Sequence, residues 1–142
     1  SGASQEKKDI FEIWRAHTPP YIATVAPRYP LDLEEKFARA AAFAGPKMFL
    51  ALAACPTGWL YDPGKTPEVA KLAVETGLWP LKEAINGVVT HTYVPKRKPV
   101  EAYLKLQGRF RHLFEPTVQT EAIQHIQARV DAYWERATRE GS

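Results

Sequence analysis

The only cysteine of the chain, Cys55, ends an apolar run and is followed directly by Pro56, Thr57, Gly58 and Trp59. A thiolate can act as a nucleophile or as a metal ligand, whereas a buried thiol packs as a small apolar side chain. Pro56 stiffens the backbone after the cysteine, and Gly58 lets the backbone approach a neighbouring group closely. A loop so rich in turn residues favours a functional role for Cys55.

The other residues of the chain restrict which chemistry the thiol can perform. A nucleophilic cysteine needs a base, and the sequence places none of the four histidines near Cys55. These are His17, His91, His112 and His125. A metal centre needs several ligands, but the chain contains no Cys-x-x-Cys motif and no histidine pair. Cys55 could therefore bind a metal only together with ligands from elsewhere.

Composition places the chain among ordinary globular proteins. Hydrophobic residues make up 45% of the 142 residues, charged residues 25%, and the formal net charge is +3. That charge is too small to indicate a nucleic-acid partner, and the basic run 96–98 is typical of a solvated loop. No apolar stretch is long enough to span a membrane, and no signal peptide is recognisable. We expect a soluble, cytoplasmic protein without an internal disulfide.

Hydrophobic periodicity and turn signals predict an α/β fold. Residues 47–54 are apolar almost throughout, which predicts a parallel strand covered on both faces. Asn86-Gly87 predicts a type I′ hairpin turn. The expected helices are 9–17, capped by Asp9, then 31–43, 66–76, capped by Thr66, 100–113 and 117–139; the expected strands are 21–25, 47–54 and a hairpin within 79–94.

The pattern divides into an α/β part, residues 1–78, and a hairpin with a helical tail, residues 79–142, which is a candidate subunit-contact region. Two parallel strands alone make a poor sheet, so we expect further strands in polypeptide that precedes Ser1, on the same or another chain. The start without Met also suggests a longer polypeptide. Tyr133 and Trp134 could either contact another subunit or cover the chain's own core.

Residues 55–88, CPTGWLYDPGKTPEVAKLAVETGLWPLKEAINGV, closely resemble the C-terminal part of the β subunit of pyruvate:ferredoxin oxidoreductases, members of the 2-oxoacid:acceptor oxidoreductase family. The preceding strand, GPKMFLALAACPTGW, and the tail, VEAYLKLQGRFRHL, are similar as well. The resemblance extends to about residue 114. It implies the C-terminal part of a doubly wound parallel sheet that binds thiamine diphosphate, followed by a β-hairpin and a helical tail.

The resemblance also implies a role for the cysteine loop. Cys55 would be one of four thiolates that hold a [4Fe–4S] cluster, with Pro56, Thr57 and Gly58 surrounding it. The other ligands would lie outside this chain. Thiamine diphosphate and Mg²⁺ would be bound mostly by residues outside the chain, with Ser1 to Ser4 at most bordering that site. No catalytic residue is assigned within the chain.

The implied activity is oxidative decarboxylation of a 2-oxoacid to an acyl-CoA or carbon dioxide, with electrons passing through the cluster to ferredoxin or a similar acceptor. The Thr-Gly-Trp sequence favours pyruvate, with oxalate or an aryl glyoxylate as further possibilities. The implied partners are coenzyme A, other subunits and the N-terminal part of the β subunit, without which the chain would be inactive. One alternative is a non-catalytic interaction module with a buried Cys55 and docking helices at 100–139; a weaker one is a stand-alone thiol enzyme.

Overall fold

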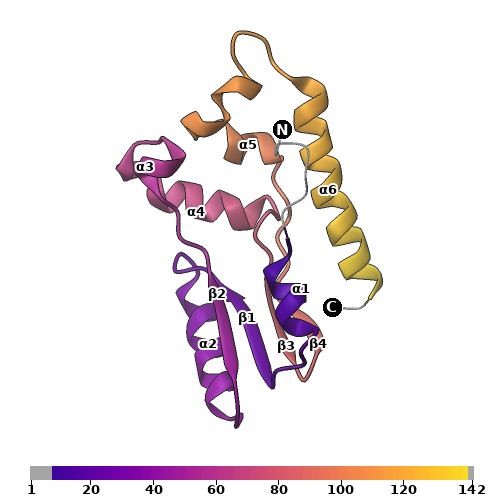
Figure 1. Cartoon of the computed structure of the whole chain (residues 1–142). Coiled ribbons are helices and arrows are strands. Elements are labelled where there is room, and N and C mark those ends of the chain that lie inside the picture. The colour runs from indigo at the N-terminus through magenta and orange to yellow at the C-terminus, as the bar shows by residue number, and fades with distance from the viewer. Residues whose placement is uncertain (1–7, 141–142) are drawn as a thin grey trace.

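The structure is a computed structural model that describes residues 8–140. Its elements are α1 (Ile10–Arg15), β1 (Tyr21–Val25), α2 (Pro30–Ala41), β2 (Lys47–Ala51), α3 (Pro56–Trp59), η2 (Pro63–Lys65), α4 (Thr66–Glu75), β3 (Leu81–Ile85), β4 (Val88–Tyr93), α5 (Val100–Leu104), η3 (Gly108–Leu113) and α6 (Thr120–Arg139). Figure 1 shows a sheet at one end, α3, α4 and α5 at the other, and α6 along the side. Among the described residues, no helix combines the length and hydropathy needed to cross a membrane.

The strands form one mixed sheet in the order β2-β1-β3-β4. β1 and β2 are parallel, with Tyr21 opposite Lys47, whereas β3 pairs antiparallel with both β1 and β4. The predicted α/β class and the parallel pair are confirmed, and the hairpin adds to that pair antiparallel. The pairing of β1 with β3 joins the two predicted parts across residues 78 and 79, whose division into domains stays a prediction.

β2 lies at an open edge of the sheet within the described chain. Lys47 and Ala51 are exposed, and the three residues between them are only partly buried. The prediction that strand 47–54 is covered on both faces is therefore wrong for this chain, because β2 has a neighbour on one side only. The strand is also shorter than predicted. Its apolar continuation, Leu52 and Ala54, packs against the helical layer instead.

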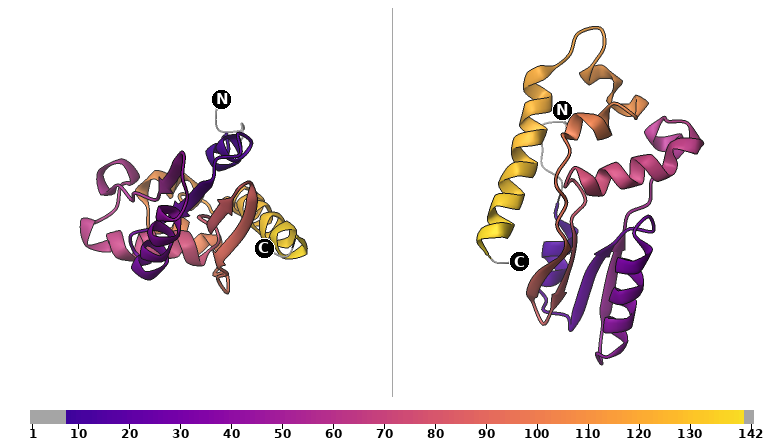
Figure 2. Two further views of the ribbon diagram at one scale, coloured as in Figure 1. Left: turned by 90° about the horizontal axis from the view of Figure 1, so that it is seen from below. Right: turned by 180° about the vertical axis from the view of Figure 1, so that it is seen from behind.

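Two helices cover opposite faces of the sheet because side chains alternate along each strand. On one face, Phe11 of α1 packs against Ile22 and Ala84. On the other, Ala40 of α2 packs against Tyr21. Figure 2 shows these two helices from below and from behind. The predicted Asp9 cap of α1 is confirmed, since the Asp9 carboxylate accepts a hydrogen bond from the backbone N–H of Glu12 at 3.1 Å.

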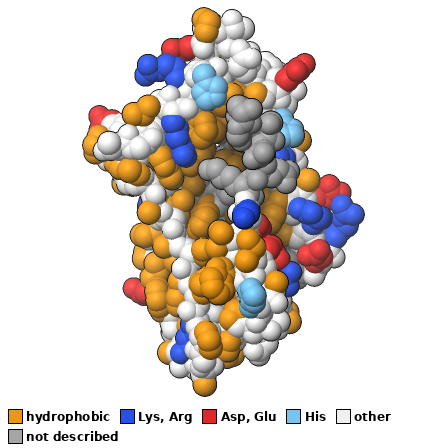
Figure 3. Space-filling model, viewed as in Figure 1, with side chains coloured by type: hydrophobic (Ala, Val, Ile, Leu, Met, Phe, Trp, Pro, Cys, Tyr) orange, Lys and Arg blue, Asp and Glu red, His pale blue; other side chains and the backbone are white. Residues whose placement is uncertain are grey.

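Cover of the sheet is incomplete. Large apolar side chains on both helices stay exposed, as Figure 3 shows for the face that carries α1. They are Ile10, Ile13 and Trp14 on α1 and Leu31 and Phe37 on α2, each more than 40% exposed. An exposed apolar surface of this kind is typical of a protein that contacts further polypeptide.

The largest core lies between α4, α5, η3 and α6. Trp134 of α6 is 4% exposed, and its indole N–H donates to the carbonyl of Gly77 at 3.1 Å. The interpretation that Trp134 covers the chain's own core is therefore confirmed. Gly77 itself ends the α4 region at φ +84°, a conformation in which glycine carries little strain.

Two predicted helix boundaries differ from the structure. Thr66 is the first residue of α4 and not its cap, because η2 leads directly into the helix and the Thr66 hydroxyl donates to the carbonyl of Pro63 at 2.8 Å. The helix predicted over 100–113 is broken into α5 and η3. Gln107 is extended there, and the N–H of Gly108 donates to the carbonyl of Leu60 at 2.7 Å instead of continuing the helix.

Candidate functional site

Cys55 lies just beyond the carboxyl end of β2, in the passage from the sheet to the helical layer. The N–H of Leu52 donates to the carbonyl of Val25 at 3.0 Å, which keeps this segment beside β1 for one more residue. Cys55 is extended, with φ −111° and ψ 105°, and α3 begins at the next residue. Ligands of open α/β sheets collect at such strand ends.

The Cys55 side chain is exposed. Alternation along the extended segment explains this, because Leu52 and Ala54 face the helical core while Ala53 and Cys55 face outward. The alternative interpretation of Cys55 as a buried structural thiol is therefore wrong for the described chain. An exposed thiol is accessible to a ligand that approaches from outside.

The sulfur accepts a hydrogen bond from the residue that closes the turn. The backbone N–H of Gly58 donates to Sγ of Cys55 at 3.3 Å, and the N–H of Trp59 donates to the Cys55 carbonyl at 2.9 Å. Pro56 occupies the first position of α3, while Thr57 and Gly58 are exposed. An amide donor of this kind favours the thiolate form of a sulfur ligand. The role of Pro56, Thr57 and Gly58 around a cofactor stays a prediction.

The described residues supply at most one protein ligand at this place. Within residues 8–140, no three side chains of the His, Cys, Asp and Glu types gather closely enough to hold a metal ion. No histidine in this part of the chain forms a hydrogen bond with Cys55, so a stand-alone thiol enzyme lacks its base here. The exposed sulfur and its amide donor fit one corner of a shared iron–sulfur site. The predicted border of the thiamine site, Ser1 to Ser4, lies outside the described residues.

A second segment supports the cysteine loop from below. Leu60 adopts a left-handed conformation at φ +58°, and its carbonyl accepts the hydrogen bond from Gly108. Arg109 lies over the ring of Trp59, with 4.0 Å from the guanidinium carbon to the ring centroid. Sequence reasoning did not identify this contact. The segment 108–110 belongs to the stretch that carries the family resemblance, but its spacing does not indicate which loop it touches.

A separate polar cluster lies between the sheet and α6. The Tyr133 hydroxyl is 2.9 Å from Nζ of Lys82 and 2.7 Å from Nε2 of His91. Lys82 is 5% exposed, and its ammonium lies over the rings of Phe11 and Tyr133. Burial lowers the pKa of Lys82 and raises that of Tyr133. The three side chains line a cavity of about 570 Å³ between α1, β4 and α6.

His91 makes the stability of the chain depend on pH. Burial, followed by the positive charge of Lys82, lowers the pKa of His91 to about 4 from 6.5. Between these values the unfolded chain binds a proton that the folded chain does not, so stability falls as the pH falls. We expect His91→Gln to remove about 2 kcal/mol of the loss in the free energy of unfolding between pH 7 and pH 4. Urea unfolding at both pH values measures this, and equal pH dependence in both proteins contradicts it.

The fold and the site define a class: an α/β chain that offers one exposed thiol at a strand end and leaves much apolar surface uncovered. Comparison with known proteins makes the assignment more specific. The chain is 47% identical over 131 residues to pyruvate synthase subunit PorB of Methanocaldococcus jannaschii. It is 38% identical over 152 residues to PorB of Pyrococcus furiosus, and 40% identical over 135 residues to ketoisovalerate oxidoreductase subunit VorB of Pyrococcus abyssi. No protein-family model matches the chain.

These matches cover 92% to 94% of the chain but only 42% to 45% of each relative. The chain thus spans less than half the length of these relatives. The predicted relationship is confirmed: the chain belongs to the family of 2-oxoacid oxidoreductase β subunits, whose C-terminal part it matches.

Proposed function

We propose that the chain is part of a 2-oxoacid:ferredoxin oxidoreductase whose preferred substrate is pyruvate. The relationship to PorB subunits over more than nine tenths of the chain is the observation that carries this proposal. The match to VorB, at 40% identity, lies within the range of the PorB matches, so overall identity does not separate the two substrates. The Thr57-Gly58-Trp59 sequence after Cys55 is the feature that favours pyruvate.

Within this enzyme, Cys55 would be one thiolate ligand of a [4Fe–4S] cluster, which when bound supplies a one-electron carrier. The exposed sulfur and the hydrogen bond from Gly58 support this role. Thiamine diphosphate and Mg²⁺ would supply the decarboxylation chemistry from sites outside the described residues. The chain itself orients the sulfur through the turn of α3 and contributes its exposed apolar faces to assembly. Coenzyme A and ferredoxin, or a similar acceptor, complete the proposed reaction.

The substrate is tested with the assembled enzyme that contains this chain. We expect kcat/KM with pyruvate, coenzyme A and a low-potential acceptor to exceed that with 2-ketoisovalerate by at least about 10-fold, because a pocket fitted to a methyl group rejects a bulkier side chain. Oxalate and an aryl glyoxylate serve as further substrates in the same assay. A preference for any of these three over pyruvate contradicts the substrate assignment. Acceptor reduction with none of the four acids overturns the proposed function.

A further inference from the structure

The turn that presents Cys55 is attached to η3, a segment far away in the sequence. Leu60 follows α3 directly, and its left-handed backbone turns the carbonyl toward Gly108, whose N–H donates to it at 2.7 Å. A methyl group at Gly108 would lie 2.8 Å from Cβ and 2.9 Å from the carbonyl oxygen of Leu60. The absence of a side chain at Gly108 is therefore what allows the two segments to approach each other.

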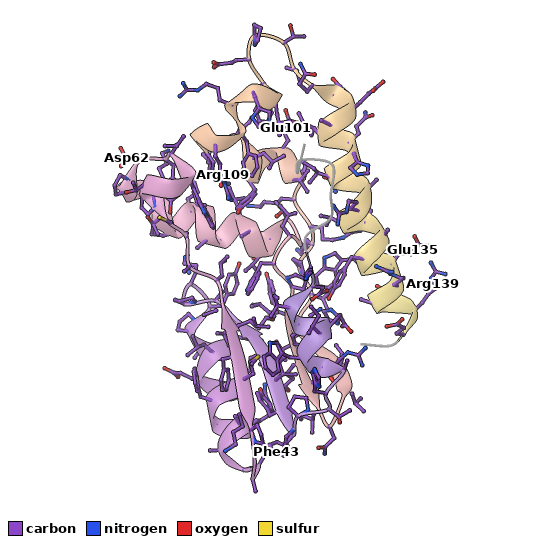
Figure 4. The ribbon with its side chains drawn as sticks, viewed as in Figure 1. Phe43, Asp62, Glu101, Arg109, Glu135 and Arg139 are labelled. Atoms are coloured by element: carbon purple, nitrogen blue, oxygen red, sulfur yellow. The ribbon has the colours of Figure 1, made fainter. Side chains whose placement is uncertain are left out.

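Arg109 makes the second attachment, and it is itself fixed on several sides. Its guanidinium lies 4.0 Å from the ring centroid of Trp59 and 4.5 Å from that of Phe110. Its Nε donates to the Gln107 side chain at 2.6 Å, and its Nη2 donates to the Tyr103 hydroxyl at 3.1 Å. Figure 4 shows the labelled Arg109 on the side of η3 that faces α3.

The partners that hold Arg109 belong to the core of the helical layer. Gln107 is 2% exposed and Tyr103 is 8% exposed, and the Gln107 amide also donates to the carbonyl of Tyr103 at 2.9 Å. The guanidinium thus connects this rigid core to the face of Trp59. Trp59 in turn donates its backbone N–H to the carbonyl of Cys55 at 2.9 Å. A continuous chain of contacts leads from the core to the cysteine.

We propose that Arg109 is a positioning residue for the cluster ligand Cys55. By holding Trp59, it fixes the turn in which the N–H of Gly58 meets the sulfur at 3.3 Å. This inference rests on the proposed function, because it concerns the sulfur as a ligand. A planar guanidinium can stack on an indole ring and donate two directed hydrogen bonds at once, which an ammonium group cannot do. Lysine is therefore an inadequate replacement despite its equal charge.

The test compares Arg109→Lys, Arg109→Gln and the control Arg111→Gln in the assembled enzyme. Arg111 lies in the same segment but is exposed. The measured quantities are the midpoint potential and the EPR spectrum of the cluster, together with iron and sulfide content. Amide hydrogen bonds to ligand sulfur stabilise the reduced cluster. We therefore expect both Arg109 variants to shift the potential to more negative values and to change the EPR spectrum, whereas Arg111→Gln retains the parent values.

Gly108→Ala provides a second variant that leaves Arg109 in place. Its methyl group pushes against Leu60, so it should displace the same turn and shift the potential in the same direction. Parent-like potentials in Arg109→Lys and Gly108→Ala overturn the proposal, and rescue by Lys alone shows that charge and not position matters, which also overturns it. Cys55→Ala in the same series separates the two levels: a cluster that survives this change refutes the proposed function itself.

Discussion

Replacing Cys55 by alanine in the assembled enzyme is expected to remove a cluster ligand and with it electron transfer to the acceptor. Changes to groups that merely support a metal ligand already cost 10- to 100-fold, so removal of the ligand should lower 2-oxoacid-dependent acceptor reduction by more than about 100-fold. Iron and acid-labile sulfide should fall by the equivalent of one cluster. Cys55→Ser should retain part of the cluster, because an alkoxide oxygen can still ligate iron.

Lys65→Gln is the matched control for this experiment. Lys65 lies close to Cys55 in the sequence, is exposed and forms only a 3.8 Å ion pair with Glu68. Exposed pairs of this kind contribute about 0–1 kcal/mol, so the control should keep both iron content and activity. Undiminished iron in Cys55→Ala, with activity within a few-fold of the parent, would show that the sulfur is not a ligand.

Gly77→Ala is expected to cause the largest loss of stability among single methyl additions at the glycines of the described chain. The new Cβ would collide with Nε1 of Trp134 and lie 3.0 Å from Cδ1 of the same ring and 3.2 Å from Cγ1 of Val130. The backbone at φ +84° adds strain for any L-residue. Displacing Trp134 from its hydrogen bond to the Gly77 carbonyl should lower the free energy of unfolding by about 3–5 kcal/mol.

Gly87→Ala separates the steric contribution from backbone strain. Gly87 has nearly the same φ, +85°, but its nearest neighbour to an added Cβ is the Thr18 methyl group at 3.6 Å, an ordinary contact. We expect a loss of about 1 kcal/mol from strain alone. Urea midpoints of the two variants of the 142-residue chain provide the comparison. Similar midpoints would mean that Trp134 yields without cost.

The local elements were predictable because their signals are local. Asp9 caps α1, strand 21–25 is found at its predicted bounds, and Asn86-Gly87 forms the hairpin turn with φ values of +49° and +85°. The order of the strands was not predictable in the same way. The antiparallel pairing of β3 with β1 depends on contacts between distant segments, for which neither strand carries a signal in its own sequence.

The candidate site was predictable in its residue but not in its surroundings. Cys55 is distinguished by the loop that follows it, and its exposure follows from alternation once the strand end is known. The support from Arg109 could not be inferred, because a cation lying on an indole ring leaves no trace in the spacing of the two residues. The exposed edge at β2 was missed for a related reason: an apolar strand has the same sequence whether its neighbour is present or belongs to another segment.

Anomalous X-ray scattering at the iron edge, from crystals of the assembled enzyme, tests the central claim most directly. The account predicts an iron peak within bonding distance of Sγ of Cys55, beside the turn in which Gly58 donates to the same sulfur. An iron-loaded enzyme in which every iron peak is remote from Cys55, and in which the sulfur remains a free thiol, would contradict it.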